Sequence, residues 1–128
     1  MKDNPLKDKS YAFALRVVKL YQYLTKTQKE YVLSKQVLRS GTSVGANIVE
    51  ANGAISKADF SAKMSIAYKE ILETKFWLEL LRDSGYIESS WFDELFVDAD
   101  ELAKMLFSVL KSTGRVDSNK SNKSNKSN

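Results

Sequence analysis

The sequence predicts an all-α protein, and more narrowly an antiparallel up-down four-helix bundle. Three observations lead to this prediction. Apolar residues recur at alternating spacings of four and three, proline occurs once in 128 residues, and helix start and stop signals divide the chain into four segments joined by short turns. Residues 1–116 should form this one domain. Residues 117–128 contain no apolar side chain and repeat Ser-Asn-Lys from Ser118 onward, and we expect this tail to be disordered.

The first two helices are expected at about 5–26 and 28–55. Asn4 followed by Pro5 is typical of a helix start, because Asn caps the exposed backbone N–H groups and Pro suits the first helical position. The stretch "TQKE", from Thr27 to Glu30, has the pattern of a capping box and predicts the start of the second helix.

The third and fourth helices are expected at about 57–84 and 90–112. "SKAD" from Ser56 provides a second capping box, and Gly85 suits the left-handed residue that follows a helix. Ser90 should cap the fourth helix, with Asp93 in its first turn, and Gly114 should end it. The predicted core positions of these two helices are Phe60, Met64, Ala67, Ile71, Thr74, Leu78, Leu81, Leu95, Ala99, Leu102, Leu106 and Val109.

The composition argues against an enzyme. The chain has neither cysteine nor histidine, which excludes disulfides, thiol nucleophiles, imidazole bases and metal sites built on those ligands. We therefore expect no catalytic residues, no metal, no cofactor and no small-molecule substrate. The N-terminus is polar and no apolar run is long enough to span a membrane, so a cytoplasmic protein without membrane association is expected.

A glycine-rich stretch, residues 39–54, is the one segment that suggests a phosphate-binding loop. It lacks the lysine that follows the second glycine of a P-loop, and no strand precedes it. On a helix its apolar arc is wider than one bundle contact requires, and interior glycines allow another backbone to approach closely. We predict a homo-oligomer contact here, formed by Leu38, Gly41, Gly45 and Val49.

A polar stripe runs beside that apolar arc and has two interpretations. It comprises Gln36, Arg39, Ser43, Asn47 and Glu50. It could form a pocket for a ligand or an RNA base. Alternatively it could be a structural polar seam in which Glu70 or Glu73 of the third helix pairs with Arg39, and we favour this second interpretation because buried charges need partners.

A basic face on the first helix is the candidate nucleic-acid surface. Arg16, Lys19, Tyr23 and Lys26 are spaced to share one side, and Lys29 and Lys35 add charge nearby. Lysines interleaved with an aromatic suit a nucleic-acid backbone with occasional base stacking, but an ordinary solvated face has the same pattern. Residues 1–57 carry ten basic and four acidic groups, whereas residues 58–119 carry seven and twelve.

Residues 38–81, "LRSGTSVGANIVEANGAISKADFSAKMSIAYKEILETKFWLELL", closely resemble the 23S rRNA intervening-sequence protein family, also called the four helix bundle protein family. The order R-x3-S-x3-N-x2-E is the specific part of the match. The resemblance implies an up-down bundle assembled into a ring-shaped homopentamer. A related branch looks like the accessory variability determinant of diversity-generating retroelements, which binds a reverse transcriptase and RNA. The residues that carry the match are Arg39, Ser43, Asn47, Glu50, Phe60, Ala67, Glu70, Glu73 and Leu81.

Two functions remain open on these grounds. The first is a non-enzymatic oligomeric adaptor, associated with RNA or a ribonucleoprotein through the basic face of the first two helices. The alternative is a structural scaffold that binds a protein partner through the more acidic third and fourth helices, with no nucleic-acid role.

Overall fold

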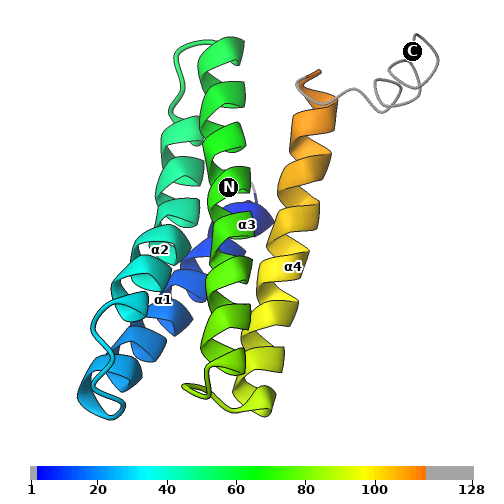
Figure 1. Ribbon diagram of the computed structural model, residues 1–128. Helices are drawn as coiled ribbons and strands as arrows, with labels where there is room; N and C mark the ends of the chain where they lie inside the picture. Colours follow the sequence, from blue (N-terminus) through cyan, green and yellow to red (C-terminus); the bar gives the residue numbers. More distant parts are fainter. Residues whose placement is uncertain (1–2, 115–128) are drawn as a thin grey trace, which may run out of the picture.

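Four helices make up the protein in a computed structural model that describes residues 3–114 (Figure 1). They are α1 (Pro5–Lys26), α2 (Leu33–Asn52), α3 (Lys57–Asp83) and α4 (Ser89–Ser112), and residues 3–114 contain no strand. Sequential helices run antiparallel, so the prediction of an all-α fold with four helices is confirmed. The predicted tail, residues 117–128, lies outside the described residues.

The start of α1 follows the sequence signals, but the start of α2 does not. Asn4 Oδ1 accepts a hydrogen bond from the Lys7 N–H at 3.1 Å, and Pro5 is the first helical residue. The predicted start at residue 28 is wrong, because Thr27 instead ends α1 and the chain turns through Lys29, whose φ is 57°. The predicted end at residue 55 is also wrong, since α2 stops at Asn52.

Glu30 is the residue that caps α2. Its carboxylate accepts backbone hydrogen bonds from Val32, Leu33 and Ser34 at 3.1, 2.9 and 2.7 Å. A carboxylate with two oxygens can satisfy three of the N–H groups that a helix leaves unpaired, which the hydroxyl of Thr27, three residues earlier, could not reach. The capping box in the sequence therefore marks the right region but the wrong capping residue.

We expect Glu30→Ala to destabilise the protein by about 1 kcal/mol or slightly more, the usual cost of losing a helix N-cap. The affected N–H groups include that of Ser34, a fully buried residue, so solvent replaces the carboxylate poorly. Urea unfolding followed by circular dichroism measures the change. Glu30→Gln keeps the shape and one acceptor, and should lose less; equal losses in the two variants would contradict a capping role for the carboxylate.

The starts and ends of α3 and α4 match the signals in part. Ser56 Oγ accepts from the Asp59 N–H at 3.0 Å, and both Gly85 and Gly114 adopt φ 82° after a helix. The prediction that Ser90 caps α4 is wrong. Glu88 occupies the cap position and forms no side-chain capping hydrogen bond, so Ser90 lies inside the first turn. The residue before Glu88, Ile87, is buried in the core.

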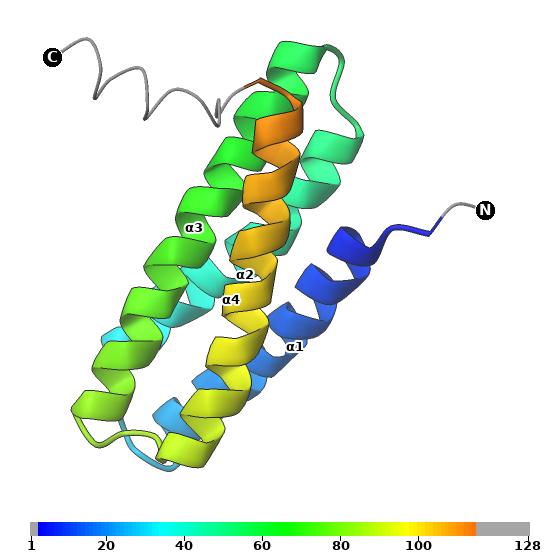
Figure 2. The same ribbon diagram turned by 90° about the vertical axis from the view of Figure 1, so that its right-hand side faces the viewer.

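All four helices contribute to one core. Most of the predicted core positions of α3 and α4 are buried, while Phe60 and Val109 pack half-buried against its edge. The ribbons of α1 and α4 approach each other near the α3–α4 turn and diverge toward the start of α1 (Figure 2). The helix order places the α1–α2 surface and the α3–α4 surface on opposite sides of the bundle. None of the helices in residues 3–114 is both long and apolar enough to cross a bilayer.

Candidate functional site

Arg39 is the centre of a polar network between α2 and α3. Its guanidinium donates to both carboxylate oxygens of Glu70 at 3.2 Å and also bonds Glu73, so the structure places it against both candidate partners. The indole N–H of Trp77 donates to Glu73 at 2.9 Å. The hydrogen bond from Trp77, followed by that from Arg39, lowers the pKa of Glu73. The hydrogen bond from Arg39 to Glu73 in turn raises the pKa of Arg39.

The rest of the polar stripe divides into separate contacts. Ser43 Oγ donates to Glu70 at 3.4 Å, and Asn47 Nδ2 donates to the Ser43 carbonyl at 2.9 Å. Glu50 instead pairs with Lys63 at 2.9 Å. Gln36 is exposed, and its side chain forms no hydrogen bond with another residue of the range 3–114.

This network lies at the surface edge of the helix pair, not in the core as the predicted buried seam required. The Arg39 side chain is 51% exposed. The buried polar contact between α2 and α3 is made by the next residue along each helix, where Thr74 Oγ1 donates to Ser40 Oγ at 2.8 Å. Arg39 is the one cation paired with the two carboxylates Glu70 and Glu73, and the described residues contain no cluster of carboxylates that could hold a metal ion. Its geometry suits alignment of α2 against α3.

The two interior glycines of α2 have different surroundings. A Cβ atom on Gly41 would come within 2.8 and 2.9 Å of the Val17 methyl carbons, so Gly41 is buried where α1 and α2 of the same chain approach closely. Its assignment to an oligomer contact is therefore wrong. A Cβ on Gly45 would meet Ser10 at 3.4–3.6 Å, an ordinary contact distance, and Gly45 faces an open groove.

That groove, which we call the α1–α2 groove, is about 620 Å³ in volume and almost entirely apolar. Leu15 and Val49 line it while 51% and 54% exposed, and Leu38 is half-buried nearby on α2. Its lining residues are Lys7, Asp8, Ser10, Tyr11, Ala12, Ala14, Leu15, Thr42, Gly45, Ala46 and Val49. Of the predicted oligomer contacts, Gly45 and Val49 thus belong to one exposed apolar surface.

The predicted basic face is smaller than expected. Arg16 bonds Asp98 of α4 at 2.8 Å, and the Tyr23 ring packs edge-on against Trp91 with 5.0 Å between centroids. Both residues therefore belong to the contact between α1 and α4, which corrects the expectation that they share an outward face with Lys19 and Lys26. The sequence could not show this, because the partners are more than 60 residues away.

Four lysines of the predicted face remain exposed and form no ion pair within the described part of the chain. They lie near the α1–α2 turn: Lys19, Lys26, Lys29 and Lys35.

A third surface, an aromatic and basic groove between α3 and α4, has no counterpart in the sequence predictions. The exposed aliphatic and aromatic residues at the outward positions of α3 were the signal that could have found it.

Comparisons with known proteins agree with a helical bundle of this size. One similar crystal structure is that of a Bacteroides thetaiotaomicron protein of unknown function from the S23 ribosomal protein family. It shares 52% sequence identity with this chain and superposes on it with a TM-score of 0.82. The match covers 83% of this chain and 98% of that chain. No match was found among curated proteins.

The molecule is thus a four-helix protein of the same class as that structure. The family profile of the 23S rRNA-intervening sequence proteins matches residues 2–108, and the chain belongs to this family. The resemblance carried by residues 38–81 is therefore confirmed.

Proposed function

We propose that this protein is a non-enzymatic, cytoplasmic adaptor that self-associates through the α1–α2 groove and holds RNA or a ribonucleoprotein on the exposed lysines toward the α1–α2 turn. The exposed apolar groove is the observation that carries the proposal, because Leu15, Val49 and Tyr11 present apolar surface that a monomer would leave in water. A homopentamer, as the family resemblance implies, would bury this surface in each copy.

The four exposed lysines support the RNA part of the proposal. Lys19 and Lys26 lie two turns apart on α1, Lys29 lies in the turn that follows, and Lys35 lies in the first turn of α2, and all four are exposed. Repetition of this cluster in a ring would let weak single contacts add up on one RNA. A reverse transcriptase bound together with that RNA is the protein partner that the related retroelement branch suggests.

A lack of catalytic activity is proposed on the chemistry of the carboxylates. Glu70 and Glu73 are bound to Arg39, and Glu50 to Lys63. Carboxylates held in this way, without an adjacent nucleophile or imidazole, suit helix alignment better than acid–base work.

Sedimentation velocity at micromolar concentration tests self-association. We expect the unmodified protein to sediment as a homo-oligomer and Leu15→Glu to sediment as a folded monomer, because each glutamate would be desolvated in the contact. Leu72→Glu, a matched change at an exposed leucine of α3, should leave the oligomer intact. A monomeric unmodified protein would overturn this part of the proposal.

A salt titration of RNA binding tests the lysine cluster. Binding should fall with a log–log slope of about −0.7 per neutralised phosphate of a single strand. Lys19→Glu with Lys26→Glu should weaken every RNA sequence alike and flatten that slope, whereas deleting residues 118–128 should matter less. Unchanged binding by the double variant, or loss only on tail deletion, would contradict an interface on α1.

One observation favours the alternative, a protein scaffold without an RNA role. The cap position and first half of α4 carry Glu88, Asp93, Glu94, Asp98, Asp100 and Glu101 without a basic residue between them. An acidic surface of this kind repels RNA and suits a basic protein partner. Absence of RNA binding by the full-length protein at low salt would favour this alternative.

A further inference from the structure

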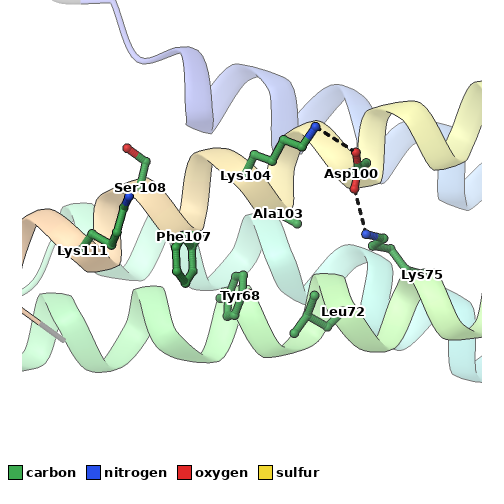
Figure 3. Close-up of a pocket in the computed structure, with 9 residues that line it drawn as sticks. All are labelled: Tyr68, Leu72, Lys75, Asp100, Ala103, Lys104, Phe107, Ser108 and Lys111. Atoms are coloured by element: carbon green, nitrogen blue, oxygen red, sulfur yellow. Dashed lines mark hydrogen bonds and ion pairs between the residues drawn. The ribbon is translucent and has the colours of Figure 1, made fainter. Parts of the chain in front are cut away.

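The outer surface between α3 and α4 carries a groove that neither the core nor the proposed RNA surface uses (Figure 3). It has a volume of about 410 Å³ and lies on the opposite side of the bundle from the α1–α2 groove. Tyr68 and Leu72 enter it from α3, and Phe107 from α4. We call it the α3–α4 groove.

The floor of the α3–α4 groove is apolar and accessible. Leu72 is 42% exposed and Phe107 is 37% exposed, and the Phe107 ring packs against Tyr68 with 5.9 Å between centroids. Phe76, one turn further along α3, is also exposed. Covering this floor with apolar side chains would therefore be favourable, because it removes apolar surface from water.

Lysines line both sides of this floor. Lys75 of α3 and Lys104 of α4 share a single carboxylate, Asp100, at 2.9 and 3.3 Å. The hydrogen bonds from Lys75 and then Lys104 lower the pKa of Asp100, which keeps it ionised. Lys111 lies over the Phe107 ring, 5.5 Å from its centroid, and forms no ion pair among the described residues. The rim thus has more positive charge than negative charge.

The antiparallel packing of α3 against α4 concentrates this positive charge. Residues 57–69 lie beside residues 102–114, and together they carry five lysines and one aspartate. Residues 70–83 and 88–101 form the other end of the pair and carry ten carboxylates and two basic groups. The acidic excess that the sequence shows for its second half is therefore confined to one end, and the α3–α4 groove extends into the basic end.

We propose that the α3–α4 groove binds a short acidic amphipathic α-helix of a partner protein, with apolar side chains over Leu72 and Phe107 and carboxylates toward Lys104 and Lys111. This site is separate from the self-association and RNA surfaces. The twelve residues from Asp100 to Lys111 span about 16 Å, or three helical turns. A helix of that length presents apolar anchors at i, i+4 and i+7 with charged residues beside them.

The same observations disfavour RNA as the occupant. A base stacks over a whole aromatic face, whereas the contacts with Lys111 and Tyr68 leave the Phe107 ring only partly accessible, which suits a smaller apolar side chain. A polyanion that continued along the groove would also reach the ten carboxylates at the other end of the helix pair. A short helix can end before that point.

Fluorescence anisotropy with a designed peptide tests the proposal on the full-length protein. The probe is a labelled, end-capped peptide of about 16 residues, with leucines at i, i+4 and i+7 flanked by glutamates. We expect saturable binding that weakens with salt. Lys104→Glu with Lys111→Glu should reduce the affinity about tenfold or more, since attraction becomes repulsion at both rim positions. Leu72→Asp should abolish binding, because it replaces an apolar side chain of the groove floor with a carboxylate.

Matched controls separate this site from general charge effects. Lys19→Glu with Lys26→Glu makes the same charge change on α1 and should leave peptide affinity unchanged. A peptide with lysines in place of the glutamates should not bind. All substituted residues except Leu72 are exposed lysines, and circular dichroism verifies that each variant is folded. The proposal is overturned by absence of binding, by equal binding of the two peptides, by an unaffected Lys104/Lys111 variant, or by oligouridine displacing the peptide from this groove.

Discussion

Gly41→Leu is expected to destabilise the folded protein by about 3 kcal/mol or more, the upper range for overpacking a close contact. Even the first carbon of the new side chain would lie 2.8 Å from a methyl carbon of Val17. Val17 is fully buried and belongs to the core. The added side chain would therefore push α1 away from α2 and disturb core packing.

Gly45→Leu is the matched comparison, four residues along the same helix. Its Cβ would meet Ser10 at ordinary contact distances, and the rest of the side chain would extend into the α1–α2 groove. We expect the bundle to stay folded, helped by the better helix propensity of leucine, while a second copy is excluded from the groove. Thermal unfolding and sedimentation together distinguish the two variants. Equal stability losses at the two positions would contradict the distinction between an internal contact and an external one.

These glycines show what the sequence can and cannot predict. Their presence inside an amphipathic helix indicates a close approach, and the pattern correctly gives the number and order of the helices. Whether the approaching backbone belongs to α1 or to another copy depends on the rotation of α2 within the bundle. Gly41 and Gly45 lie only about 40° apart around the helix axis, and a sequence does not fix the rotation of a helix to that precision.

Partners that are distant in the chain limit the prediction of the surface in the same way. Arg16 and Tyr23 have the spacing of an exposed face, but Asp98 and Trp91 of α4 engage them. Arg39 was expected to pair with Glu70 or Glu73 because a conspicuous cation between apolar residues needs a carboxylate nearby. The aromatic and lysine residues of the α3–α4 groove have no such local pattern, since two of them come from α3 and three from α4.

The charge balance between α2 and α3 depends on Arg39, and its removal should be costly at neutral pH. Arg39→Met leaves Glu70 and Glu73 side by side without their cation. Charge-assisted hydrogen bonds contribute more than neutral ones, but the half-exposed guanidinium is screened by solvent. We therefore expect a loss of about 1–2 kcal/mol, or a fall in melting temperature of about 5 °C or more.

The loss should depend on pH in a direction set by Glu73. Its pKa is lowered in the folded protein, so its stabilising contribution is present above the ordinary glutamate pKa of about 4.3 and disappears as the pH falls through the folded value. In acid, the unmodified protein loses the ion pair and Arg39→Met loses its carboxylate repulsion, so the two melting temperatures should converge. Melting curves at neutral pH and below pH 4 measure this. The control is Lys35→Met, which removes a cation without an ion-pair partner from the same helix and should melt close to the unmodified protein at neutral pH. If the deficit of Arg39→Met is equally large in acid, Arg39 acts through packing of its aliphatic stem instead of through its charge.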